Sequence, residues 1–150
     1  MSRGTEVKIV LENPIVMINT EINEFQLNIR LFSRITFITG DSGIGKSYLY
    51  NQLSLLSTED EYKFIKCFNY LSPDVEKQIK SASKNADNLI VIDNFETLWS
   101  KNLTSIILSS PARFALISRD FFGLMQSPNS VAELDVNNSS IGLTYPMPAG

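Results

Sequence analysis

Residues Ile35–Ser47 read Ile-Thr-Phe-Ile-Thr-Gly-Asp-Ser-Gly-Ile-Gly-Lys-Ser, which is an apolar run followed by a complete G-x-x-x-x-G-K-[ST] loop. The glycines let the backbone turn back on itself and bring several N–H groups close to anionic oxygens. Lys46 adds a positive charge for the β- and γ-phosphates, and Ser47 adds a hydroxyl for Mg²⁺. A helix that begins here points its positive end at the same place. The motif therefore predicts a strand, a phosphate-binding loop and a helix that together bind a nucleotide. The residues expected to contact the nucleotide are Gly40, Asp41, Ser42, Gly43, Ile44, Gly45, Lys46, Ser47 and Tyr48.

Composition excludes several classes of function. The chain has 150 residues, of which 43% are hydrophobic and 19% charged, as expected for one folded domain. A net charge of -3 gives no electrostatic signature of nucleic-acid binding. There is no histidine, so imidazole catalysis and histidine zinc sites are excluded, and the single cysteine, Cys67, rules out an internal disulfide. The apolar segment 7–18 is interrupted by Lys8 and Pro14, which fits neither a signal peptide nor a membrane span. We therefore expect a cytoplasmic protein without a membrane partner.

Apolar periodicity divides the chain into alternating elements. A β-rich start over residues 1–33 contains short runs at 7–11, 15–19 and 25–31. Further strands are predicted at 34–39, 62–70, 89–92 and 114–117, with a hairpin formed by 131–136 and 141–145. Helices are predicted at 46–56, from Pro73 as the first helical residue to about Ala86, and as one segment over 95–107.

This alternation predicts an α/β fold, specifically a three-layer sandwich around a central, mainly parallel sheet, with extra antiparallel strands at the N-terminus and a C-terminal hairpin. We expect residues 1–150 to form one domain, in which an additional strand separates the phosphate-loop strand from the strand 89–92. Ligands of such sheets bind at the carboxyl ends of the strands. Gly40, Asp93 and Arg119 each follow a predicted strand, so the sequence predicts one site made from three strand ends.

Asp93 and Glu96 are the candidate acids of this site. Asp93 ends the apolar run Leu89–Ile92, which is typical of a Walker B carboxylate that holds Mg²⁺ together with Ser47. The alternative is that Asp93 or Asn94 caps the following helix. Asn94 cannot act as a base, whereas Glu96 could orient or deprotonate an attacking water, or could be a solvated acid favoured by the helix dipole.

Arg119 follows the strand next to Walker B, where a guanidinium could contact a γ-phosphate. A salt bridge between Arg119 and Asp120 is the alternative, and Arg113 at the other end of this strand is expected to be structural. We expect the aromatic residues Phe95, Trp99 and Phe114 to lie in the core rather than to stack on a base. The pair Phe121–Phe122 could contact a partner, although packing is the simpler expectation.

The segments 40–47, 89–96 and 116–120 together resemble those of signal-transduction ATPases with numerous domains, within the P-loop NTPase superfamily. In that family an Asp-Asp or Asp-Asn pair ends Walker B, and an arginine follows a small hydroxyl residue. The resemblance implies phosphate and Mg²⁺ contacts for Lys46 and Ser47, a metal contact for Asp93 and a γ-phosphate contact for Arg119. The β-rich start is instead similar to ABC-type ATPases, although no Leu-Ser-Gly-Gly-Gln signature follows and Arg119 replaces their switch histidine.

These features predict a slow, nucleotide-dependent switch or regulatory ATPase that binds ATP and Mg²⁺ and acts through a protein partner or as a homo-oligomer. Lys46, Glu96 and Arg119 are the predicted catalytic residues, and Ser47 and Asp93 the predicted metal-binding ones. A small-molecule kinase that transfers the γ-phosphate remains an alternative, as does a degenerate domain that serves as an interaction module. ATP is preferred to GTP because no Asn-Lys-x-Asp guanine signature is present.

Overall fold

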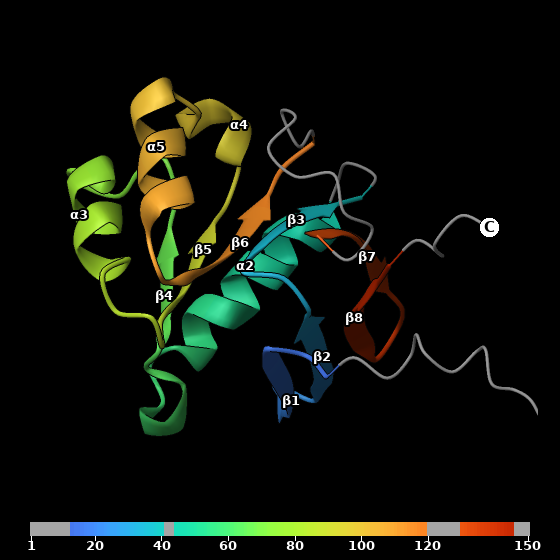
Figure 1. The fold of residues 1–150 in the computed structure, drawn as a ribbon. Helices are drawn as coiled ribbons and strands as arrows, with labels where there is room; N and C mark the ends of the chain where they lie inside the picture. The colour runs from blue at the N-terminus through green and yellow to red at the C-terminus, as the bar shows by residue number, and fades with distance from the viewer. Residues whose placement is uncertain (1–12, 41–43, 120–129, 146–150) are drawn as a thin grey trace, which may run out of the picture.

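In the computed structural model, which describes residues 13–40, 44–119 and 130–145, eight strands form one mixed sheet. The strands are β1 (Val16–Ile22), β2 (Phe25–Leu31), β3 (Ile35–Thr39), β4 (Ile65–Phe68), β5 (Leu89–Ile92), β6 (Arg113–Ile117), β7 (Val131–Val136) and β8 (Ser140–Thr144). Their order across the sheet is β1-β2-β8-β7-β3-β6-β5-β4 (Figure 1). Five of the seven neighbouring pairs are parallel, and only β1–β2 and β7–β8 are antiparallel.

Four α-helices and one 3₁₀ helix connect the described strands. They are α2 (Ile44–Leu56), α3 (Val75–Ala82), α4 (Phe95–Leu98), α5 (Lys101–Ser109) and the 3₁₀ helix η1 (Asp60–Tyr62). Helix α2 lies on one face of the sheet, and the sheet curls so that β1, β2, β7 and β8 come around it (Figure 1). Helices α3, α4 and α5 cover the opposite face (Figure 1). None of the described helices is both long and apolar enough to cross a membrane.

The core has two parts because alternate strand residues point to opposite faces of the sheet. On β3, Ile38 packs with Leu49 and Leu53 of α2 in one cluster of buried side chains. Phe37, its neighbour in sequence, packs on the other face in a cluster that also contains Phe95 of α4. Both clusters are almost closed to solvent, so each face of β3 is buried and the strand is held firmly where the phosphate loop begins.

Several predicted elements are confirmed. The bounds of β2, β5 and β7 are those expected, the β1–β2 and β7–β8 pairs are antiparallel, and β6 lies between β3 and β5. The predicted fold class is confirmed only in its coarser part: the fold is mixed α/β, with one curled sheet that combines parallel and antiparallel pairs. The three-layer sandwich stays a prediction. The strand predicted at 7–11 lies outside the described residues.

Two predicted helices are wrong in their extent. The helix expected from Pro73 to Ala86 begins at Val75 and ends at Ala82, because Asp74 before it has a left-handed backbone conformation with φ 46°. The segment expected as one helix over 95–107 is two helices, because Trp99 leaves the helical conformation and Ser100 is extended. The Ser100 hydroxyl accepts a hydrogen bond from the Leu103 N–H, which starts α5 as a separate helix.

Candidate functional site

The candidate site begins where β3 leads into the phosphate loop and α2. Gly40 follows β3 directly, and α2 begins at Ile44. The Lys46 ammonium group donates a hydrogen bond of 2.7 Å to the carbonyl oxygen of Gly40. Lys46 is therefore folded back across its own loop. Asp41, Ser42 and Gly43 lie outside the described residues.

Side chains from three separate parts of the chain surround a cavity of about 110 Å³. It is lined by Lys46, Ser47, Asp93, Asn94, Glu96, Ile117, Ser118 and Arg119. These residues come from the first turns of α2, the end of β5, α4 and the end of β6. The strands β3, β6 and β5 are parallel neighbours, so their carboxyl ends open on the same edge of the sheet. The structure thus brings together the predicted residues Lys46, Ser47, Asp93, Glu96 and Arg119.

Asp93 is held at the end of β5 with 8% of its surface exposed. Burial raises the pKa of its carboxyl group above the usual value. The backbone N–H of Asn94 and the ammonium group of Lys46 oppose this shift, whereas the carboxylate of Glu96 adds to it. The charged form of Asp93 is therefore poorly stabilised by its surroundings. A cation bound beside a carboxylate in such a position stabilises that form strongly.

The capping alternative is wrong for the Asn94 side chain. Asn94 occupies the N-cap position, but its side chain makes no capping hydrogen bond. Its backbone is left-handed, with φ 49° and ψ 49°, and its carbonyl accepts a hydrogen bond from the Thr97 N–H. This turn starts α4 immediately after β5 and brings Glu96 back to the cavity.

Glu96 and Arg119 form a long ion pair at the edge of the cavity. Oε2 of Glu96 lies 3.9 Å from Nε of Arg119, and 27% of the Glu96 side chain and 78% of the Arg119 side chain are exposed. Oε1 of Glu96 is buried and has no hydrogen-bond partner within the described part of the chain. Glu96 is therefore only partly solvated, although it lies in the first turn of α4 as that alternative expected. Asp120, the alternative partner for Arg119, lies outside the described residues.

Strand β7 packs directly on the phosphate loop, a contact that the sequence did not reveal. A Cβ atom added at Gly45 would lie 3.1 Å from Cδ2 of Leu134 and 3.3 Å from Cγ2 of Val136. A Cβ atom at Gly40 would lie 3.3 Å from Cβ of Leu134. These contacts are tighter than ordinary van der Waals contacts, so a side chain at either glycine would require Leu134 or Val136 to shift by a few tenths of an ångström.

The structure separates Tyr48 from the rest of the predicted set. Its side chain does not line the cavity, and its ring packs edge to face against Phe25 of β2 at a centroid distance of 5.0 Å. Ser118 is a site residue that the sequence analysis did not single out. It is buried, lines the cavity and donates its backbone N–H to Ile38 of β3. Its position between an apolar strand and Arg119 was the available signal.

The other predicted residues divide between core and surface. Phe95 and Phe114 are fully buried, as expected, whereas Trp99 is 44% exposed, so its assignment to the core is wrong. Arg113 is structural, as predicted, because its guanidinium group donates hydrogen bonds to the carbonyls of Asn88, Asp87 and Ile15. The pair Phe121–Phe122 lies outside the described residues.

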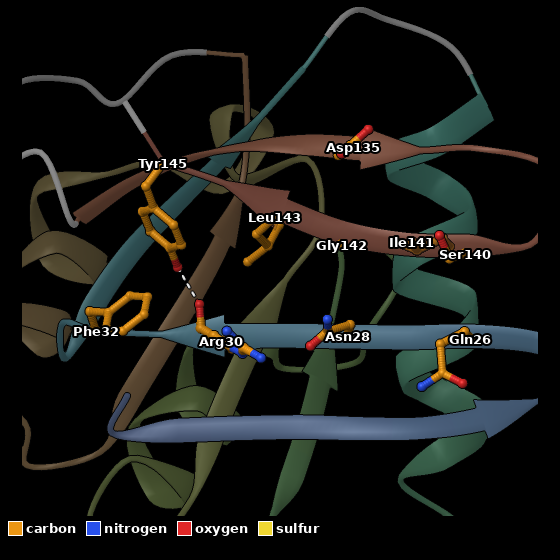
Figure 2. Close-up of a pocket in the computed structure, with 10 residues that line it drawn as sticks. All are labelled: Gln26, Asn28, Arg30, Phe32, Asp135, Ser140, Ile141, Gly142, Leu143 and Tyr145. Atoms are coloured by element: carbon orange, nitrogen blue, oxygen red, sulfur yellow. Dashed lines mark hydrogen bonds between the residues drawn. The ribbon is translucent and has the colours of Figure 1, made fainter. Parts of the chain in front are cut away.

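A larger hollow, of about 500 Å³, lies on the outer side of the sheet between β2 and the β7–β8 hairpin, and it contains none of the predicted site residues. Figure 2 shows Tyr145, just after β8, reaching toward Arg30 of β2, whose carbonyl oxygen accepts a hydrogen bond from the tyrosine hydroxyl. Phe32 packs edge to face against the Tyr145 ring. The smaller cavity is the candidate site, because the predicted charged residues converge there.

Cys67 lies on β4 near this site, with Tyr50 of α2, Ser54 and Asp93 around it. Burial raises the pKa of the Cys67 thiol from 9.0 to about 11; Ser54 opposes this shift by a hydrogen bond, and the charge of Asp93 adds to it. Burial likewise raises the pKa of Tyr50 to about 12. The charge of Asp93 also adds to the shift of Tyr50, so both groups lie within electrostatic range of this carboxylate.

We expect the Cys67 thiol to react about 100-fold more slowly with a thiolate-directed alkylating reagent at pH 8 than the same thiol in the unfolded chain, because two pKa units lower the thiolate fraction by that factor. The rate in the folded protein should keep rising about tenfold per pH unit up to a pH of about 11. The corresponding contribution to folding stability is present below about pH 9 and is lost as the pH rises, since the folded state holds the proton more tightly. A plateau of the labelling rate near pH 9 would contradict the raised pKa, whereas simple steric shielding would lower the rate equally at every pH.

The predicted metal-binding groups, the Asp93 carboxylate and the Ser47 hydroxyl, both line this cavity. Among the described residues no cluster of three or more histidine, cysteine or acidic side chains is arranged to hold a metal. The donors suit Mg²⁺, which is commonly bound through one or two protein oxygens, several waters and the phosphates of a substrate.

Comparison of the chain with protein-family models, with curated proteins and with solved structures finds no match.

Proposed function

We propose that this chain is a P-loop NTPase domain that binds ATP and Mg²⁺ and hydrolyses the nucleotide slowly as a switch. The observation that carries the proposal is the convergence of Lys46, Ser47, Asp93, Glu96 and Arg119 on one cavity from three separate parts of the sequence. Each of these side chains has the chemistry that one part of a bound Mg²⁺ triphosphate requires. A loop that merely turned the chain would not need the other two segments beside it.

The strand order supports the same proposal. A three-layer P-loop sandwich in which one strand separates the loop strand from Walker B has parallel strands in the order that β7, β3, β6, β5 and β4 follow. In this arrangement Lys46 would hold the β- and γ-phosphates, Ser47 and Asp93 the hydrated Mg²⁺, and Arg119 the γ-phosphate. When bound, Mg²⁺ would supply charge neutralisation for the phosphate oxygens.

Slow turnover follows from the residues after Asp93. Asn94 is exposed and cannot take a proton, so Glu96 is the acid available to orient a water molecule. Glu96 is paired with Arg119 rather than free, and its second oxygen is buried. Glu96 must first leave Arg119 before it can orient a water molecule, so hydrolysis is expected to be slow. A slow rate suits a switch better than a housekeeping ATPase.

The Lys46–Gly40 hydrogen bond favours a second candidate, an interaction module that binds no nucleotide. An ammonium group held at 2.7 Å by its own loop must give up this bond before it can contact a phosphate. A neutral acceptor is a weaker partner for an ammonium group than a phosphate oxygen, so the exchange favours the anion. For this reason we prefer the nucleotide-binding function.

Titration with Mg²⁺·ATP, Mg²⁺·GTP and Mg²⁺ alone tests the proposal. Nucleotide at about 100 times its Kd is expected to stabilise the fold by about 2.7 kcal/mol, which raises Tm by about 5 to 10 °C for a domain of this size. Trp99 directly follows α4 and is partly exposed, so its fluorescence should change when Glu96 and Arg119 rearrange. Heat of binding measured by calorimetry provides an independent readout.

The outcomes separate the candidates. Slow phosphate release without an acceptor supports the switch, transfer that depends on an added small-molecule acceptor supports the kinase, and nucleotide binding without turnover supports a binding module. No change of Tm, fluorescence or heat with any nucleotide overturns the proposal and leaves the nucleotide-independent module.

A further inference from the structure

The contact between Glu96 and Arg119 suggests how the site would distinguish a triphosphate from a diphosphate. We propose that Glu96 is the resting counter-ion of Arg119, and that exchange of this carboxylate for the third phosphate is the step that makes the site specific for a nucleoside triphosphate. This inference rests on the proposed function, because it assigns a role to two residues of the same cavity.

The pair is built to be exchanged rather than to be permanent. Its 3.9 Å separation is at the long end for an ion pair, and most of the Arg119 side chain is exposed to solvent. A long pair with so exposed an arginine contributes little to stability, because water screens the guanidinium charge and both side chains lose freedom. Arg119 follows β6 at the rim of the cavity, so its guanidinium group can turn from Glu96 toward a ligand between the strand ends.

Glu96 is incompletely satisfied by this contact. Its Oε1 atom is closed to solvent and receives no hydrogen bond from residues 13–40, 44–119 or 130–145. A buried acceptor without a donor costs free energy that a ligand-bound water could recover. Departure of Arg119 would leave both oxygens of Glu96 free to accept hydrogen bonds from such a water. Movement of Arg119 from Glu96 to the third phosphate would thus detect the triphosphate and, in the same step, free Glu96 to orient the water.

A phosphate dianion competes well for Arg119 because a guanidinium group can form two parallel hydrogen bonds to phosphate oxygens. A diphosphate lacks the group that reaches Arg119 and would leave the pair intact. The free energy needed to break the Glu96–Arg119 pair therefore reduces the affinity for a triphosphate but not the affinity for a diphosphate. Removal of the Glu96 charge should tighten binding of a triphosphate and leave binding of a diphosphate nearly unchanged.

A double-mutant cycle with Glu96→Gln and Arg119→Ala tests this inference. Calorimetric titrations would use Mg²⁺ with ADP and Mg²⁺ with a non-hydrolysable ATP analogue on the whole chain. We expect Glu96→Gln to tighten the analogue about 3-fold, the range of an exposed ion pair, and to change ADP binding by less. Glutamine keeps the size of the side chain, and Glu61→Gln, an exposed change on η1 outside the cavity, removes the same charge as a matched control.

The Arg119→Ala background separates the pair from simple repulsion. Loss of any carboxylate near phosphates reduces charge repulsion, and this effect persists without Arg119. An equal gain from Glu96→Gln in both backgrounds would overturn the inference while leaving nucleotide binding intact. A gain that requires Arg119 supports it. Absence of nucleotide binding by the unmodified chain would overturn the proposed function and this inference together, so the two failures are distinguishable.

Discussion

Replacement of Lys46 by alanine is expected to weaken binding of Mg²⁺·ATP about 100-fold, because charge-assisted hydrogen bonds from one ammonium group to two phosphates are worth about 3 kcal/mol. Lys46 lines the cavity with Ser47 and Asp93, and it carries the positive charge nearest to the loop backbone. Calorimetry or the fluorescence of Trp99 measures the change in Kd.

The fold should survive this substitution. Alanine at this position removes the Lys46–Gly40 hydrogen bond from the resting protein, and one such bond contributes about 1 kcal/mol. Lys66→Ala on β4 removes the same charge from an exposed position away from the cavity and should leave Kd unchanged. Equal affinities for Lys46→Ala and the unmodified chain would show that the nucleotide, if bound, is not held at this loop.

Phe95→Ala is expected to lower the free energy of unfolding by about 3 to 5 kcal/mol, the usual cost of removing a buried aromatic ring. The Phe95 side chain is fully buried, and its ring meets that of Phe37 at a centroid distance of 6.0 Å and an interplanar angle of 70°. The contact joins the start of α4 to β3, so the cavity left behind would lie beneath the candidate site. Urea denaturation with an unchanged slope measures the loss.

Tyr70→Ala is the matched control, because it also removes an aromatic ring but from a residue that is 60% exposed. Its effect should stay within about 0.5 kcal/mol. A loss below about 1 kcal/mol for Phe95→Ala would mean that α4 is not anchored through this ring. Glu96 directly follows Phe95, so nucleotide affinity should also fall in the Phe95 variant, since the acid and Asn94 lose their fixed backbone.

The sequence predicted the parts of the site that depend on local pattern. The phosphate-loop motif placed α2 after β3, and the apolar runs before Asp93 and Ser118 marked two strand ends. Parallel strands end on one edge of a sheet, so the convergence of these residues follows from the strand pattern alone. Residues at the ends of neighbouring parallel strands meet in space even when they are far apart in the sequence.

Contacts between distant segments could not be predicted in the same way. The position of β7 beside β3, and with it the packing of Leu134 on Gly45, depends on which strands pair across the sheet. The ion pair of Glu96 with Arg119 depends on the left-handed turn at Asn94, which no periodic pattern records. The break at Trp99 was hidden because the apolar spacing continues through it into α5, even though Ser100 is a favourable N-cap residue.

The position of β6 between β3 and β5 sets the distance between the phosphate loop and Asp93. Neighbouring strands lie about 4.8 Å apart, so the strands that precede the phosphate loop and Asp93 are separated by nearly 10 Å. A ligand that contacted both the phosphate loop and Asp93 would span the carboxyl end of β6, where Ser118 and Arg119 lie. Binding of such a ligand would restrict the movement of β3, β6 and β5 relative to one another. Amide hydrogen exchange of β6 should then slow more than that of the edge strands β1 and β4.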